Sequence, residues 1–193
     1  MLHEAFSRSS RTWKSSPCRK KLFKKLDLVK QRIGHTLTTA ICLGSGSFSS
    51  MNVTNNSRAM IQFVAFEDSA KGLQGFAQDP TFTVVDKWFL RDIGIKVLEC
   101  ETDVVGLGPA VGHVGPESLV FDAFLPNIPR LVRELFGARP GVLVNNEVEA
   151  VKNLNAKAQA YLANRQVVGF PGFHEDDTVF SELKVFWEDG PED

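Results

Sequence analysis

An apolar run that ends in alternating glycine and serine constrains the fold of this chain more than any other feature. Residues 38–43 read TTAICL, and residues 44–47 read GSGS. Such a run is typical of a buried strand, and the glycines allow the tight turn with which α/β folds lead from a first strand into a helix. The N–H groups of such a turn can approach an anion or a nucleotide. The sequence therefore predicts an α/β fold with a binding site near residue 44.

Strand and helix signals alternate along the rest of the chain. Apolar residues at helical spacing predict a helix over 52–70, and Thr83 with Asp86 resembles a capping box that opens another helix. Further strands are predicted at 75–78, 95–98, 118–125 and 141–144, a helix at 128–136, and a strand that could run antiparallel within 179–187. Because parallel strands need right-handed crossovers, we expect one doubly wound, mostly parallel Rossmann-like sheet in the order 3-2-1-4-5. Ligands are then expected at the carboxyl ends of strands 1 and 4.

Charge divides the chain into two parts. Residues 1–36 carry ten Lys or Arg against two acids, a net charge of +8, whereas the remainder has a net charge of −9. Within residues 18–36, apolar residues recur every three or four positions and predict a basic amphipathic helix with its lysines toward solvent: Leu22, Leu26, Val29 and Ile33. Residues 1–17, rich in Ser and Arg, are typical of a disordered tail or a weak organellar targeting signal. The domain itself is expected at 37–188, followed by an acidic tail at 189–193.

Composition narrows the expected location and partners. No run of about 18 apolar residues is present, so no membrane helix is predicted. The three cysteines and four histidines lack the spacing of a metal site, and an odd number of cysteines favours a reduced compartment. We expect an intracellular protein of the cytoplasm or nucleus without a bound metal. Nucleic acid is a less favoured partner, because the basic residues are accounted for by a solvated helix face.

The glycine turn itself has two interpretations. Gly44 and Gly46 could bring N–H groups to a phosphate or to the carboxylate of an S-adenosyl ligand, or they could only permit the turn. A dinucleotide fingerprint would have a third glycine where Ser49 stands, and methyltransferase turns often have an acidic residue where Cys42 and Leu43 lie. The cofactor is therefore left open, with a nucleotide or S-adenosylmethionine as the candidates. The turn also lacks the Gly-x-Ser-x-Gly elbow of serine hydrolases.

Three residues beyond the turn are candidates for the same site. Asp79 follows the second strand, where a ribose-binding carboxylate would lie, although an Asp before a proline is also a common start of a turn. Arg58 and Gln62 are one helical turn apart and could face a ligand together. An exposed surface position is the alternative for Arg58, and Gln62 is expected to hydrogen-bond to the glycine loop.

Two further residues lie near the expected edge of the sheet. His113 belongs to a glycine-rich segment, residues 106–116, which could act as a lid or serve as an exposed connection. Asp122 lies inside the apolar fourth strand, where a buried carboxylate would need hydrogen bonds, so it is either a site residue or a residue of an exposed face.

Taken together, several spaced motifs resemble the sensitivity-to-red-light-reduced (SRR-like) domain family. That family has a hydrophobic-Gly-x-Gly-(Ser/Asn)-Phe turn, a helix bearing Gln, and an Asp-Pro-x-Phe-Thr segment. The corresponding segments here are ICLGSGSFS at 41–49, SRAMIQ at 57–62, QDPTFT at 78–83 with Asp86, a strand at 119–126 followed by Asn127, and a segment at 173–180 with Asp177-Thr178. The resemblance covers residues 38–180.

The resemblance implies a regulatory role rather than a defined reaction. Members are linked to circadian and light signalling in plants, to clock-gene expression and haem-biosynthesis regulation in animals, and to microtubule-related phenotypes in yeast. Many members have Pro-His-Cys where this chain has Pro126-Asn127-Ile128, so any chemistry of that His and Cys should be absent here.

We therefore expect a regulatory protein that binds protein partners and has a cleft for a small anionic or nucleotide-like ligand. The alternative is a nucleotide- or S-adenosylmethionine-using enzyme of the same fold, in which case a methyltransferase-like transferase is expected. The predicted ligand-binding residues are Gly44, Ser45, Gly46, Ser47, Arg58, Gln62, Asp79 and Asn127.

Overall fold

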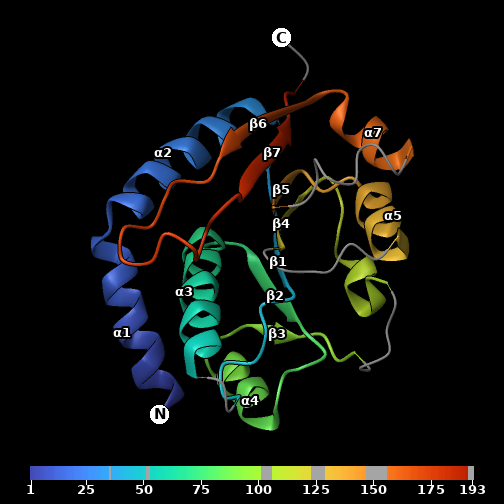
Figure 1. Cartoon of the computed structure of the whole chain (residues 1–193). Coiled ribbons are helices and arrows are strands. Elements are labelled where there is room, and N and C mark those ends of the chain that lie inside the picture. The colour runs from blue at the N-terminus through green and yellow to red at the C-terminus, as the bar shows by residue number, and fades with distance from the viewer. Residues whose placement is uncertain (35, 51–52, 101–105, 123–128, 147–155, 191–193) are drawn as a thin grey trace.

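A single seven-stranded sheet organises the molecule (Figure 1). The computed structural model describes residues 1–34, 36–50, 53–100, 106–122, 129–146 and 156–190. The strands are β1 (Thr39–Leu43), β2 (Gln74–Gln78), β3 (Lys96–Val97), β4 (Ser118–Asp122), β5 (Val142–Asn145), β6 (Arg165–Gly169) and β7 (Lys184–Glu188). Their order is β3-β2-β1-β4-β5-β7-β6.

The first five strands pair in parallel in the predicted order 3-2-1-4-5. The predicted C-terminal strand is β7, and it runs antiparallel to β5. The structure adds β6, which the sequence did not predict, as a second antiparallel strand at the edge. The Rossmann-like α/β fold is thus confirmed, with two antiparallel strands extending one side of the sheet.

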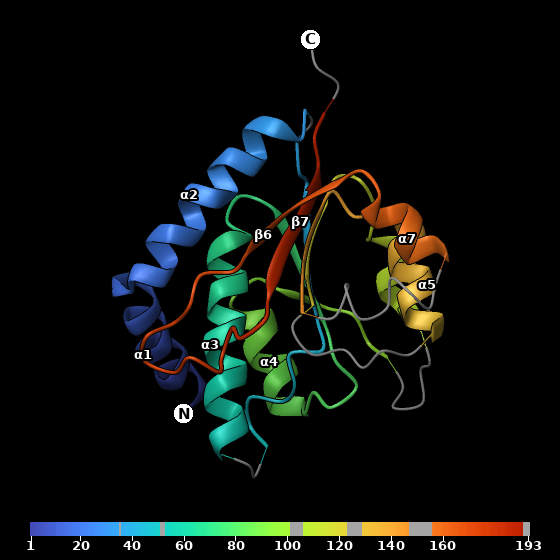
Figure 2. The ribbon, with the colours of Figure 1, turned by 45° about the horizontal axis from the view of Figure 1, so that its top comes forward.

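Helices cover both faces of the sheet. They are α1 (Leu2–Ser15), α2 (Pro17–Arg32), α3 (Val53–Ser69), α4 (Val84–Asp92), the 3-10 helix η1 (Gly108–Gly112), α5 (Pro129–Ala138) and α7 (Ala156–Leu162). Helices α1 to α4 lie on one face and α5 and α7 on the other, as two views of the ribbon show (Figures 1 and 2). Within the described part of the chain, no helix is long and apolar enough to cross a membrane.

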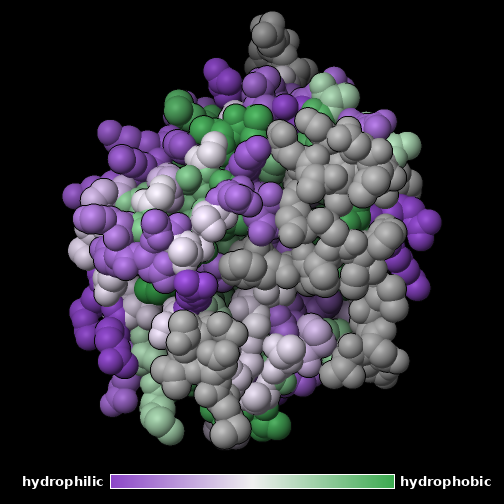
Figure 3. Space-filling model, viewed as in Figure 1, coloured by the Kyte–Doolittle hydropathy of each residue, from purple (hydrophilic) through white to green (hydrophobic). Residues whose placement is uncertain are grey.

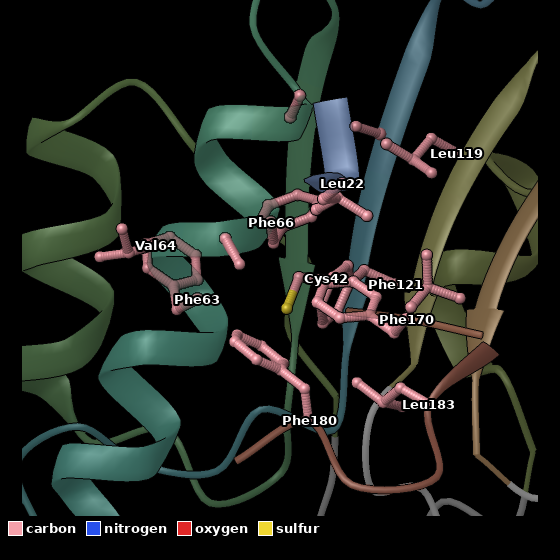
Figure 4. Close-up of a cluster of buried hydrophobic side chains, with 14 of the residues drawn as sticks. Leu22, Cys42, Phe63, Val64, Phe66, Leu119, Phe121, Phe170, Phe180 and Leu183 are labelled. Carbon is pink, nitrogen blue, oxygen red and sulfur yellow. The ribbon is translucent and has the colours of Figure 1, made fainter. Parts of the chain in front are cut away.

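Alternation along β1 divides the core between the two faces. Ala40 and Cys42 pack in the core beneath α1 to α4, whereas Ile41 and Leu43 pack in the core beneath η1 and α5. Figure 4 shows the first core, where aromatic side chains from α3, β4 and the segment between β6 and β7 surround Cys42. This packing fixes the carboxyl end of β1, from which the glycine turn departs.

The N-terminal residues form a helix rather than the disordered tail that we expected. Trp13 of α1 is fully buried, and its Nε1 donates to Asp68 Oδ2 of α3 at 3.0 Å. The same carboxylate accepts from Arg19 Nε of α2 at 2.6 Å and is 1% exposed. Composition could not predict this helix, because its packing depends on one buried tryptophan, Trp13, in an otherwise polar segment. A targeting role for residues 1–17 stays a prediction.

Helix α2 has the amphipathic character expected of residues 18–36. Ser16 caps it, since its Oγ accepts from Arg19 N at 3.1 Å, and Pro17 occupies the first turn. The four apolar side chains of the predicted stripe are buried: Leu22, Leu26, Val29 and Ile33. Hydrophilic side chains gather over α1 and α2 at the surface (Figure 3).

Candidate functional site

The glycine turn begins directly after β1 and adopts a left-handed backbone. Gly44 and Gly46 have φ values of 65° and 76°, which favour glycine at both positions. The Gly44 N–H donates to the carbonyl of Gln78, the last residue of β2, at 3.1 Å. The turn is therefore tied to the neighbouring strand from its first residue.

Asp79 holds the next part of the turn. Its Oδ2 accepts from Gly46 N at 2.7 Å, and its Oδ1 accepts from the N–H and hydroxyl of Thr81 at 2.8 and 2.6 Å. The side chain is 8% exposed. Of the two interpretations of Asp79, the structure shows the start of a turn, because Asp79 bonds to Thr81. Asp79 also bonds to a second loop through Gly46.

Asp86 holds the remainder of the turn. It is fully buried and accepts from Ser47 Oγ at 2.7 Å and from Phe48 N at 3.1 Å. It also accepts from the N–H and the hydroxyl of Thr83 at 2.8 and 3.0 Å, while Thr83 Oγ1 accepts from Asp86 N, so the predicted capping box of α4 is confirmed. Residues 44–49 and 78–86 thus form one hydrogen-bonded unit, which we call the glycine-aspartate unit.

This unit uses N–H groups that an anion would need. The N–H groups of Gly44, Gly46, Phe48 and Ser49 donate to acceptors within the protein, namely Gln78, Asp79, Asp86 and the Ser47 hydroxyl. An anion-binding turn presents such groups to its ligand instead. Two carboxylates, Asp79 and Asp86, also bond directly to the turn and would repel a phosphate bound to it, so the turn is poorly suited to hold a phosphate.

A cleft of about 510 Å³ opens between the glycine turn, α3 and the connection from β2 to α4. The described residues that line it are Gly44, Ser45, Gly46, Ser47, Ser50, Arg58, Ala59, Gln62, Thr81 and Thr83. Six of the predicted ligand-binding residues are among them, whereas Asp79 lies behind the lining as a hydrogen-bond partner of Gly46 and Thr81. Asn127 lies outside the described residues. The structure therefore brings most of the predicted site together.

Gln62 lies on the cleft but does not bond to the glycine loop, so that prediction is wrong. Its Nε2 donates to the carbonyl of Val179 at 2.6 Å, because the segment between β6 and β7 packs against α3. The residue is 2% exposed, and its Oε1 accepts no hydrogen bond from the described residues. A buried amide oxygen without a donor is costly unless a ligand or water supplies one.

Arg58 lies one turn before Gln62 at the more open end of the cleft. Its Nε is 3.4 Å from Asp176 Oδ2, and the two side chains are 43% and 37% exposed. A hydrogen bond from the Thr178 hydroxyl, together with Arg58, holds the pKa of Asp176 below its usual value. Among the described lining residues, Arg58 is therefore the cation of the cleft, and it is paired with a carboxylate.

The comparison with known families agrees with these motifs. The SRR1 domain matches residues 18–187, which is most of the chain. The chain belongs to the SRR1 domain family. No curated protein matches it. In this SRR1 domain, two of the motifs that carried the resemblance, residues 41–49 and 78–83 with Asp86, lie in contact as the glycine-aspartate unit.

Sequence reasoning missed part of the cleft. Ser50, Thr81 and Thr83 line it, and Asp86 holds its loop, but none was predicted to belong to the site. The capping box was the available signal for Asp86. Its carboxylate can accept more hydrogen bonds than the start of α4 requires, so it could also bond to a second segment. The family resemblance included residues 173–180, but the contacts of this segment with Arg58 and Gln62 had no local signal, since its path depends on the antiparallel strands β6 and β7.

The other face of the sheet has a separate polar row at its carboxyl edge. Asp122, which is 2% exposed, accepts from Asn145 Nδ2 at 2.8 Å, so Asp122 belongs to a buried pair rather than to an exposed face. Gln78 donates to the carbonyl of Leu107 and accepts from Ala110 N, which holds η1 against the sheet of this SRR1 domain.

His113 stacks on Phe76 with ring centroids 4.1 Å apart, near η1 and away from the cleft. Among the described residues, no group of three metal-ligating side chains could hold an ion.

Proposed function

We propose that this SRR1-domain protein is an intracellular regulator that acts by binding protein partners and has a small-ligand site in the cleft. The family resemblance supports a role in circadian or light signalling, or in control of transcription or haem biosynthesis. The observation that carries the proposal is an exposed apolar surface on α4. Val84, Val85 and Trp88 are 74%, 57% and 74% exposed.

This α4 surface has the character of a protein contact. Phe89 and Leu90 of the same helix are buried, so α4 is already anchored and its outer apolar side chains are not needed for its packing. Exposed apolar patches bordered by polar residues mark interaction sites, and tryptophan is enriched among residues that dominate binding. Hydrophobic side chains reach the surface at the lower edge of Figure 3, where α4 lies in Figure 1.

A groove of about 1090 Å³ runs beside this surface, between α1, α3 and α4. Met60, Ile61 and Phe89 contribute apolar lining, and the charged lining residues are of both signs: Glu4, Arg8 and Asp92. An amphipathic helix can place its apolar face in such a groove and its charges at the rim. We therefore take the partner segment to be an amphipathic helix of another protein.

The arrangement of the cleft favours binding over catalysis. Asp79 accepts three hydrogen bonds and Asp86 accepts four. These hydrogen bonds use most of the acceptor capacity of both carboxylates, which weakens the alternative of a nucleotide- or S-adenosylmethionine-using enzyme.

Proximity labelling in cells tests the partner-binding proposal. Wild-type protein is compared with Trp88→Glu, and Leu28→Glu is the matched control, because Leu28 is 59% exposed on α2, outside the groove. We expect at least one partner whose labelling falls tenfold or more in Trp88→Glu and is unchanged in Leu28→Glu. Equal labelling by all three proteins would exclude α4 as the contact, and no labelling above a tag-only background would contradict the proposed function.

A further inference from the structure

We propose that the cleft binds a metabolite with an α-amino-acid head group, whose ammonium meets Gln62 and whose carboxylate meets Arg58. This inference rests on the ligand cleft of the proposed function and assigns the class of its ligand. It narrows the candidates that the sequence left open, because S-adenosylmethionine carries such a head group whereas a nucleotide without an amino-acid part does not. The ligand class is inferred from the donors and acceptors of the cleft that can still bind a ligand.

Gln62 offers an acceptor at the buried part of the cleft. Because Nε2 donates to Val179 O at 2.6 Å, the orientation of the amide is fixed and Oε1 is the remaining group. Oε1 accepts no hydrogen bond from the described residues, although Gln62 is only 2% exposed. A ligand that carries N–H groups would satisfy this oxygen, whereas a phosphate, which has only acceptors when fully ionised, would not.

The hydroxyl groups of the lining are also acceptors. The Ser47 hydroxyl donates its proton to Asp86, the Thr81 hydroxyl to Asp79, and the Ser50 hydroxyl to Asn56 Oδ1. A hydroxyl has a single proton to donate, so these oxygens can only accept from a ligand. An ammonium, with three N–H donors, is complementary to such a lining.

The charge around the cleft disfavours a phosphate ester. Among the described residues, the charged side chains that line the cleft or bond to its lining are three carboxylates and one cation: Asp79, Asp86, Asp176 and Arg58. A phosphate monoester would bring a charge of about −1.5 to −2 into this environment. An amino-acid zwitterion brings no net charge and places its positive end toward the carboxylates.

Arg58 gives the ligand its direction. It is 43% exposed whereas Gln62 is 2% exposed, so the cation lies toward the mouth and the amide oxygen toward the interior. Asp176 Oδ2 is 3.4 Å from Arg58 Nε, and the fork of a guanidinium can bind a ligand carboxylate in a bidentate manner. The ammonium is thus expected to enter first, with the carboxylate at the mouth.

Calorimetric titration of the full chain tests the inference with two sets of probes. The first set is S-adenosylmethionine, S-adenosylhomocysteine and the twenty amino acids, and the second is inorganic phosphate, AMP, ATP and NAD. We expect saturable binding of at least one probe of the first set and of none of the second. That binding should weaken at least tenfold in Gln62→Leu and stay unchanged in Gln166→Leu, a matched control at an exposed position of β6.

Asp176→Asn tests the role of Arg58 at a partly exposed position, where the substitution should not disturb the core. Asn can still accept from Thr178 through Oδ1, but it no longer competes as an anion for Arg58. We expect the zwitterionic probe to bind at least twofold more tightly to this variant.

Several outcomes would overturn the assignment. Binding confined to the phosphate set would overturn the ligand class and leave the ligand cleft standing. Zwitterion binding that is unchanged in both Gln62→Leu and Asp176→Asn would place the ligand elsewhere. Absence of binding by either set would overturn the inference together with the ligand cleft, whereas the partner-binding proposal is decided separately by Trp88→Glu.

Discussion

The Asp79 carboxylate accepts the N–H of Gly46 at 2.7 Å, across 33 residues of sequence. In dinucleotide-binding folds a carboxylate at the end of the second strand commonly binds the ribose of the ligand. In this SRR1 domain the carboxylate at that place binds the protein's own glycine turn. Asp79 thus stabilises the glycine turn, which lines the cleft.

Removal of the Asp79 carboxylate should destabilise the protein. Asp79→Ala leaves the N–H groups of Gly46 and Thr81 without their acceptor in a mostly buried place. We expect the free energy of unfolding to fall by about 2–3 kcal/mol, and by about 1 kcal/mol in Asp79→Asn, which keeps one acceptor oxygen. Urea denaturation measures both, with Asp27→Ala on the exposed side of α2 as control. An unchanged midpoint in Asp79→Ala would show that these bonds do not stabilise the fold.

Asp68 should make stability depend on pH in the acid range. Burial would raise its pKa, but hydrogen bonds from Arg19, Lys71 and Trp13 outweigh burial and hold the pKa below the usual value. Because the folded pKa is below the unfolded one, the stabilisation is present above about pH 4 and is lost as pH falls through the folded pKa.

The substitution Asp68→Asn tests this dependence. It should lower the free energy of unfolding by about 2 kcal/mol at pH 7 and flatten the decline of stability below pH 4. Denaturant unfolding between pH 2 and pH 7 provides the comparison with wild type. Parallel curves for the two proteins at all pH values would contradict the assignment of the acid-sensitive group.

The three thiols should differ in reactivity. Burial raises the pKa of Cys18 to about 12 and that of Cys42 above its usual range. Burial also raises the pKa of Cys100, which is only partly buried. Since the thiolate is the reactive form, a disulfide reagent at neutral pH should modify Cys100 slowly and the other two only after unfolding. Cys100→Ser should then show no reactive thiol in the native state, and a rapid reaction of that variant would contradict the burial of Cys18 or Cys42.

The parallel part of the fold was predictable because each of its elements has a local signal. The turn at Gly44, the capping box at Thr83 and Asp86, and the apolar strands all reflect properties of neighbouring residues. The disorder expected of residues 1–17 was wrong because Trp13 and Asp68 meet only in the folded chain. Strand β6 was missed because it is mostly exposed at the sheet edge and has no alternation of apolar and polar residues.

The candidate site shows the same division. Spacing along α3 placed Arg58 and Gln62 on the cleft, because residues four apart share a helix face. The partner of Gln62 could not be predicted, since Val179 comes from a segment whose path is set by β6 and β7.

A double-mutant cycle between Ser47 and Asp86 tests most directly whether the two motif segments form one hydrogen-bonded unit. Ser47 Oγ donates to Asp86 Oδ2 at 2.7 Å, and the residues are 39 positions apart. The free energies of unfolding of Ser47→Ala, Asp86→Ala and the double variant give the coupling between the two side chains. A coupling of about 1–2 kcal/mol is predicted for a hydrogen bond to a buried carboxylate. Effects that add to within about 0.3 kcal/mol would contradict the existence of the glycine-aspartate unit.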